Sequence, residues 1–288
     1  MISRALSQQD QTTLKRQYHI DIAKSTSLYC EESGQGGQAI VFIPGWTMTT
    51  AVFEHQHSYF ADSENYRVIT YDPRSHGLST KTETGNTYEQ HGRDLDLLIK
   101  KLGLENVILA GWSFGVLAAF TYLEQFSSTN IKAFINIDCA AKTSGLDNTS
   151  EWVWYNYNDS DGMKRWFTMG SLENRQIFNR EFAEWMLEDI NEENIAWVEQ
   201  MAINTPGTTA ALLNETASYL DFEDMLRNLD AVLPMLFVVR EEWRTLAGDW
   251  HKNNTPNAKL EVMGKHLMFW ERHREFNHLL DSFISGLR

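Results

Sequence analysis

Short apolar runs alternate with amphipathic segments through the first half of the chain. Runs of adjacent apolar residues, such as 39–43, are typical of strands buried on both faces of a parallel sheet. Segments 87–102 and 116–126 instead have apolar residues at helical spacing, and Thr87 can cap the first of them. Strands that alternate with helices predict an α/β fold with a mostly parallel sheet and helices on both faces. The expected strands are residues 18–23, 27–31, 39–43, 66–71, 106–110, 131–137, 235–239 and 260–263.

The alternation stops at about residue 143 and returns after residue 228. The intervening stretch consists of acidic helical segments and holds five of the ten tryptophans. We therefore predict a core made of residues 17–142 and 229–288, with a helical cap (143–228) inserted after the sixth strand. We expect the chain to end in an amphipathic helix over 270–284, and residues 1–16 to form a loose or weakly helical arm.

Composition and charge narrow the class of protein. The chain has 288 residues, 42% of them hydrophobic, which is enough for one large domain with a cap. Its formal net charge of −14 disfavours nucleic-acid partners and anionic membrane surfaces. There is no apolar run of about 18 residues and no signal-peptide pattern at the start of the sequence. Cys30 and Cys139 form neither a disulfide framework nor a metal site. We therefore expect a cytoplasmic protein that acts on a small molecule.

A candidate nucleophile lies between an expected strand and an expected helix. Residues 111–115 read G-W-S-F-G and follow directly on the strand 106–110. In this context the G-x-S-x-G pattern predicts a nucleophile elbow, a tight turn that lifts the hydroxyl of Ser113 above the carboxyl end of the sheet. The helix that follows directs its positive end at charge that develops there.

A serine hydroxyl needs a base, and His266 has the right position in the sequence. It lies in the loop between the last expected strand and the final helix, so it should reach the same sheet edge as Ser113. The other histidines are weaker candidates. His251 is expected on a surface helix, and His273 and His278 on the outer face of the final helix. His55 and His57 form an H-x-H pair without the other ligands of a metal site.

Three carboxylates could hold the histidine in its working tautomer. In the usual arrangement the acid follows the strand 235–239, but Trp243 occupies that position. Glu242 could serve with a small shift in register, as could Glu241. Asp138 ends the strand 131–137 and is the preferred prediction, since a neighbouring strand end can reach the same histidine.

The charge on a tetrahedral intermediate needs two N–H donors. We expect the backbone amides of Phe114 and Trp46 to supply them, because Gly45 lets the loop after residue 43 come close to the site. No cofactor and no metal are predicted. The residues that we expect to line the substrate pocket are Trp112, Trp152, Trp154 and Phe269.

With these motifs the sequence resembles the α/β-hydrolase fold superfamily over nearly its whole length. The resemblance rests on the elbow at 111–115, the segments 44–46, 72–79, 264–266 and 269–271, and the order serine, acid, histidine. The segment 219–226 before Leu233 resembles esterase and haloperoxidase-like members that use no metal. The resemblance implies a serine nucleophile, a histidine base and hydrolysis of ester, lactone or thioester bonds.

Three positions depart from the family pattern. Pro44 replaces the common histidine before the oxyanion glycine, Ser75 replaces a usual glycine, and Trp243 stands at the late acid position. A Gly-Trp oxyanion loop with an earlier acid also resembles the cofactor-independent dioxygenases of 3-hydroxy-4-quinolones. The first prediction is a serine hydrolase that cleaves an acyl bond of a small-to-medium apolar substrate. The alternatives are such a dioxygenase, in which a His–Asp dyad carries the reaction, and a non-catalytic ligand receptor.

Overall fold

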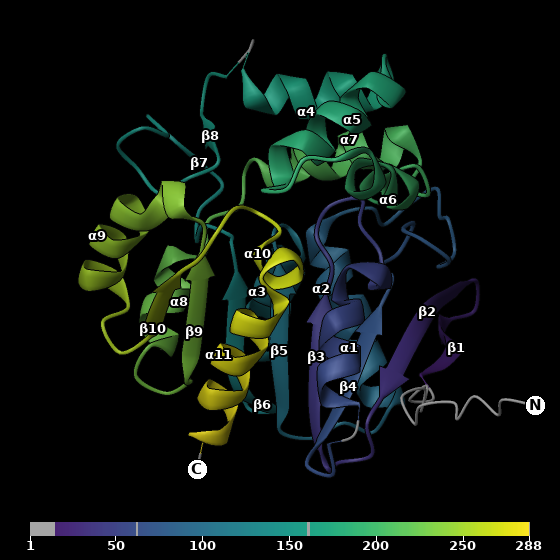
Figure 1. Ribbon diagram of the computed structural model, residues 1–288, viewed down its shortest axis with the longest axis vertical. Coiled ribbons are helices and arrows are strands. Elements are labelled where there is room, and N and C mark those ends of the chain that lie inside the picture. The colour runs from purple at the N-terminus through teal and green to yellow at the C-terminus, as the bar shows by residue number, and fades with distance from the viewer. Residues whose placement is uncertain (1–14, 62, 160–161, 288) are drawn as a thin grey trace, which may run out of the picture.

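An eight-stranded sheet crosses the middle of the protein, as shown by a computed structural model that describes residues 15–61, 63–159 and 162–287. The strand order is β1-β2-β4-β3-β5-β6-β9-β10. The pairs β1–β2 and β2–β4 are antiparallel, and every other neighbouring pair is parallel. The predicted mostly parallel sheet is confirmed (Figure 1). The strands are β1 (Arg16–Ala23), β2 (Thr26–Ser33), β3 (Gln38–Ile43), β4 (Tyr66–Tyr71), β5 (Val107–Trp112), β6 (Ile131–Ile137), β9 (Met235–Val239) and β10 (Lys259–Val262).

Helices cover both faces of this sheet, α1 and α11 on one and α2 and α3 on the other (Figure 1). Thr87 caps α2 as expected, since its side chain accepts a hydrogen bond from the backbone amide of Gln90. The apolar stripe of α2 is buried against the core, with Leu95 and Leu98 fully inaccessible. The core helices are α1 (Glu54–Phe60), α2 (Tyr88–Lys101), α3 (Gly115–Phe126), α9 (Arg244–Asn254), α10 (Met268–Glu271) and α11 (His273–Ser285), with short 3-10 turns at η1 (Thr50–Phe53) and η2 (Glu241–Trp243).

The ends of the chain differ from the sequence-based prediction. Most of the predicted arm, residues 1–14, lies outside the described residues. Arg16 was wrongly assigned to it, because this residue begins β1, where it pairs with Glu32 of β2. The single helix predicted over 270–284 is also wrong: it is interrupted at Arg272, whose φ of −106° and ψ of 36° are not helical.

The segment between β6 and β9 contributes most of the structure above the carboxyl edge of the sheet. Helices α4 to α7 lie together above that edge, whereas α8 lies lower, beside β9 (Figure 1). The cap boundaries at residues 143 and 228 stay a prediction. The elements of this segment are β7 (Ser144–Gly145), β8 (Tyr155–Asn156), α4 (Met163–Leu172), α5 (Arg175–Met186), α6 (Glu192–Ala202), α7 (Gly207–Ala217) and α8 (Glu223–Leu229).

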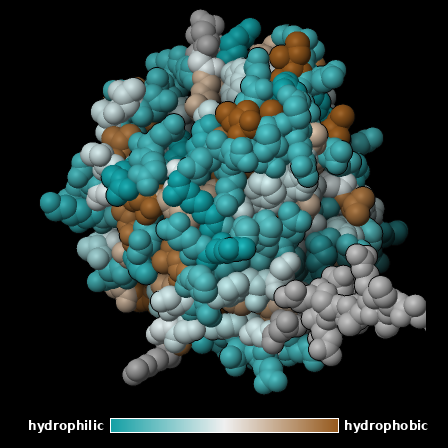
Figure 2. Space-filling view, in the orientation of Figure 1, coloured by the Kyte–Doolittle hydropathy of each residue, from teal (hydrophilic) through white to brown (hydrophobic). Residues whose placement is uncertain are grey.

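The outer surface is mostly polar on the face that Figure 2 shows, with hydrophobic residues in separate small groups. Within the described ranges, no helix has both the length and the apolar character needed to cross a bilayer.

Candidate active site

Ser113 occupies the predicted elbow between β5 and α3. Its backbone φ of +52° is the strained geometry that this turn imposes. Its amide donates to the carbonyl of Ile137 at 2.8 Å, which ties the elbow to the end of β6. Glycine is required at position 115, because a Cβ there would lie 2.4 Å from the carbonyl oxygens of Ile43 and Pro44. The turn therefore lifts the serine hydroxyl above the carboxyl edge of the sheet.

His266 reaches Ser113 from the loop after β10. Its Nε2 lies 3.0 Å from Ser113 Oγ, and its side chain is almost completely buried. The indole of Trp112 donates to the backbone carbonyl of His266 at 2.9 Å, which fixes the loop from below. Two groups 153 residues apart in sequence are thus brought together as predicted.

Asp138 lies on the other side of the imidazole. Its Oδ2 is 2.5 Å from His266 Nδ1, and its side chain is fully buried. The turn after β6 that presents it has a φ of +56° at Asp138. Asn136 stabilises that turn, since its side chain both accepts from the amide and donates to the carbonyl of Cys139.

The alternative acid, Glu242, does not contact His266 in this structure. Its side chain is 68% exposed and pairs with Arg240 at 3.2 Å. The strand order permits an acid after either strand, because β6 and β9 both lie between β5, which presents the serine, and β10, which leads to the histidine. The side-chain contacts decide between them: Asp138, after β6, contacts His266, whereas Arg240, the first residue after β9, contacts Asp138.

Burial keeps His266 a neutral base, and nearby groups keep Asp138 an ionised acid. Burial lowers the pKa of His266 below its usual value, and the nearby Asp138 opposes that effect only in part. Burial alone would raise the pKa of Asp138, but the positive Arg240 and the hydrogen bond with His266 outweigh it and hold that pKa below the ordinary value. At neutral pH the imidazole can therefore accept a proton.

The two predicted oxyanion donors lie beside the serine. Trp46 and Phe114 both line the cavity that contains Ser113. Gly45 allows the close approach of the loop, because a Cβ at this position would be 2.9 Å from the Cβ of Ser113. Within the part of the chain that the structure describes, the backbone amides of Trp46 and Phe114 have no hydrogen-bond acceptor. Both are therefore available to a negative oxygen.

The cavity at Ser113 is small and aromatic. Its volume is about 10 Å³, room for about one water molecule. The indole N–H of Trp46 donates to Ala210 of α7 at 2.8 Å and so joins the oxyanion loop to the helices above it. The lining residues are Trp46, Ser113, Phe114, Trp154, Tyr155, Phe167, Phe182, Trp185 and His266.

Of the four predicted pocket residues, Trp154 lines this cavity and the other three do not. Trp112 and Phe269 are fully buried and pack against each other beneath His266. Trp152 instead packs against Trp243. The predictions for Trp112 and Phe269 were wrong because closeness in sequence to the serine or histidine does not set the direction of a side chain. The prediction for Trp152 was wrong because this ring faces Trp243 instead.

Four wall residues were not predicted from the sequence: Tyr155, Phe167, Phe182 and Trp185. A signal was present for two of them, because Phe178, Phe182 and Trp185 follow helical spacing on one side of α5. Arg240 was also not assigned a role, although it is the first residue after β9 and contacts Asp138 at 2.9 Å.

The remaining histidines have other environments. His251 was expected on a surface helix; it lies on α9 but is buried against Phe237. His57 is buried between hydroxyl groups of Ser33 and Thr70, whereas His55 stacks on His273. His55 and His57 therefore point to different neighbours.

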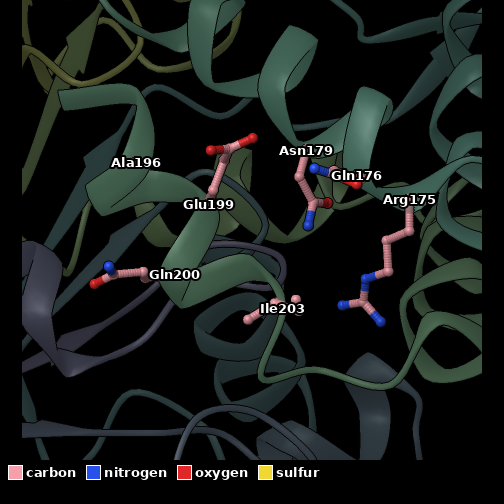
Figure 3. A pocket seen from close by; sticks show the side chains of 7 residues that line it. All are labelled: Arg175, Gln176, Asn179, Ala196, Glu199, Gln200 and Ile203. Carbon is pink, nitrogen blue, oxygen red and sulfur yellow. The ribbon is translucent and has the colours of Figure 1, made fainter. Parts of the chain in front are cut away.

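A larger hollow of about 530 Å³ lies between α5 and α6, away from the serine (Figure 3). None of the residues that meet at Ser113 contributes to it. Its lining residues are Arg175, Gln176, Asn179, Ala196, Glu199, Gln200 and Ile203.

The fold is that of the α/β hydrolases, and comparisons with known proteins agree with it. Residues 38–172 match the family model of the alpha/beta hydrolase fold. The chain is 28% identical over 270 residues to the "Putative non-heme chloroperoxidase" of Synechocystis sp., covering 89% of this chain and 94% of that one. The chain has the α/β-hydrolase fold, and its relatives support an enzyme of the hydrolase type.

Two solved structures share the fold. The bromoperoxidase from Bacillus anthracis superposes with a TM-score of 0.83 at 22% identity, covering 94% of this chain and 100% of that one. The esterase from Exiguobacterium antarcticum gives a TM-score of 0.80 at 23% identity, covering 91% of this chain and 96% of that one.

Proposed function

We propose that the protein is a serine hydrolase that cleaves an ester, lactone or related acyl bond through an acyl-enzyme. The observation that carries the proposal is the continuous series of contacts from Asp138 Oδ2 to His266 Nδ1, and from His266 Nε2 to Ser113 Oγ. This is the geometry that activates a serine hydroxyl as a nucleophile.

The contacts define the order of proton transfers. His266 Nε2 takes the proton of Ser113 as Oγ attacks the carbonyl carbon, and the amides of Trp46 and Phe114 stabilise the negative oxygen. When the bond to the leaving group breaks, His266 gives that proton to the departing oxygen. A water then gives a proton to His266 and attacks the acyl group, and Ser113 recovers its proton on release of the acid. Asp138 stabilises the imidazolium in both halves of the reaction.

The cavity favours an uncharged, apolar acyl group. Seven of its nine lining residues are Trp, Tyr or Phe, and no carboxylate or ammonium group is among them. Because the cavity admits only one water, substrate enters only after side chains of the segment above the sheet move. We therefore assign residues 143–228 the role of a cap.

A fluorophosphonate probe tests the proposal directly. We expect a covalent adduct on Ser113, found by mass spectrometry of the digested protein, because the probe needs an activated hydroxyl. His266→Ala should abolish the adduct. His251→Ala is the matched control: this histidine is also buried but has no contact with Ser113, so labelling should persist. An unmodified wild-type protein would count against the acyl-enzyme.

Truncation of a cavity wall should change substrate preference. Phe182→Ala removes a ring from the cavity, so kcat/KM for bulky acyl esters should rise about tenfold relative to acetyl esters. Phe178→Ala is the control, because this ring stacks on Phe182 but does not line the cavity. Both variants should lose about 3–5 kcal/mol of stability, so the ratio between substrates is the informative measurement. If the ratio of kcat/KM for bulky acyl esters to that for acetyl esters were the same in both variants, Phe182 would not determine substrate preference.

A second candidate is a cofactor-independent dioxygenase. The position of the acid favours it, since Asp138 follows β6 rather than β9, and so does an aromatic cavity that suits a flat heteroaromatic ring. In that reaction the His266–Asp138 pair removes a proton from the substrate, and Ser113 only positions the substrate.

A further inference from the structure

Arg240 makes two contacts with the acid of the site. It is the first residue after β9, and its backbone amide donates to Asp138 Oδ1 at 2.9 Å. Its Nη1 donates to Oδ2 at 2.9 Å, the same oxygen that contacts His266 Nδ1. Three donors thus fix both oxygens of the carboxylate, and the guanidinium and the imidazole share one of them.

Aromatic rings enclose the guanidinium. Its central carbon lies 3.5 Å from the ring centroid of Trp243, 4.9 Å from that of Trp154 and 5.6 Å from that of Trp185. Only 6% of the Arg240 side chain is exposed. Solvent therefore screens its charge weakly, and the charge acts strongly on neighbouring groups.

Two of these rings also belong to the reaction cavity. Trp154 and Trp185 line that cavity and lie 5.5 and 4.9 Å from the His266 ring. Arg240 is thus located behind the cavity wall, with the acid on one side and the rings on the other. It does not itself line the cavity, and its polar contact with the reacting groups runs through Asp138.

On the basis of the proposed function, we propose that Arg240 is a positioning residue that acts through Asp138. It holds the carboxylate in the orientation that His266 requires, and its positive charge sets the lower end of the pH range in which His266 works as a base.

The charged groups around Asp138 and His266 determine in which direction the protonation of His266 changes. Asp138 favours the protonated imidazole and Arg240 disfavours it. Glu242 favours it weakly from an exposed position. The thiol of Cys139 stays neutral because burial raises its pKa, and Lys265 points away to carbonyl groups at the end of α5.

Loss of the positive charge should therefore move the acidic limb of the pH profile upward. Without it, the negative Asp138 stabilises the imidazolium more strongly, so His266 becomes a free base only at higher pH. In Arg240→Gln, which keeps hydrogen-bond donors but not the charge, we expect the acidic limb of kcat/KM to rise by roughly one pH unit. Arg240→Lys, which keeps the positive charge, should move the acidic limb much less than Arg240→Gln does.

A matched control separates this effect from the loss of a buried ion pair. Arg74 forms a bidentate ion pair with buried Asp94: its Nε and Nη2 donate to the two carboxylate oxygens, each at 2.7 Å. Neither residue lines the cavity at Ser113. Arg74→Gln should lower stability without moving the limb. The proposal would be overturned if a folded Arg240→Gln variant had the same acidic limb of kcat/KM as the wild type. It would also be overturned if Arg74→Gln shifted that limb by the same amount as Arg240→Gln.

A second readout does not depend on hydrolysis. The imidazole nitrogen signals of His266, followed by NMR across pH in the wild type and in both Arg240 variants, report its protonation directly. The midpoint should rise in Arg240→Gln and move much less in Arg240→Lys. If Ser113→Ala retains full activity, the proposed function fails, while this titration still decides whether Arg240 acts on His266. An unchanged midpoint in Arg240→Gln would remove Arg240 from this role.

Discussion

Ser113→Ala is expected to reduce ester hydrolysis by about 10⁴- to 10⁶-fold, with little change in stability. The reason is that the hydroxyl is the only nucleophile in contact with His266 Nε2 among the described residues, and the acyl-enzyme cannot form without it. The residual rate comes from the two amide donors and from substrate binding. The measurement is kcat/KM for a chromogenic ester, together with the melting temperature.

The same variant separates the two candidate reactions. A dioxygenase needs the His266–Asp138 pair but not a serine nucleophile, so Ser113→Ala should then keep much of its oxygenation rate. Ser218→Ala is the control, because among the described residues this buried hydroxyl, just after α7, donates only to the carbonyl of Asn214, so its loss should leave either activity unchanged. Retention of ester hydrolysis in Ser113→Ala would overturn the proposed function.

Asp138→Asn is expected to lower turnover by about 10⁴-fold while the protein stays folded. The amide has the same shape as the carboxylate, and its oxygen can still accept from Arg240. Its NH₂ group would then donate to His266 Nδ1, which places the imidazole proton on Nε2. In that tautomer Nε2 has no lone pair for the proton of Ser113.

The control for this variant is Glu242→Gln, which we expect to change kcat less than twofold. Glu242 is exposed and contacts Arg240 rather than His266. Steady-state kinetics across pH on both variants give the comparison. A large loss in Glu242→Gln with a small loss in Asp138→Asn would reassign the acid.

The local sequence pattern was sufficient to predict the main strands and helices of the core. The bounds of β4, β6 and β9 agree with the predicted ranges, and Thr87 caps α2. Such features depend on a few neighbouring residues, through side-chain period, capping and strand propensity. The break at Arg272 was not predicted, because the apolar pattern continues through the backbone change at that position.

The sequence by itself determined the sheet, the elbow at Ser113 and a histidine in the loop after the last strand. The tertiary structure alone decided that Asp138 rather than Glu242 contacts that histidine, that Arg240 pairs with the acid, and that Trp154 rather than Trp112, Trp152 or Phe269 faces the cavity. The physical reason is that these outcomes depend on distances between strand ends and on side-chain directions. Both are set by strand order and packing across segments far apart in sequence, which local periodicity does not record.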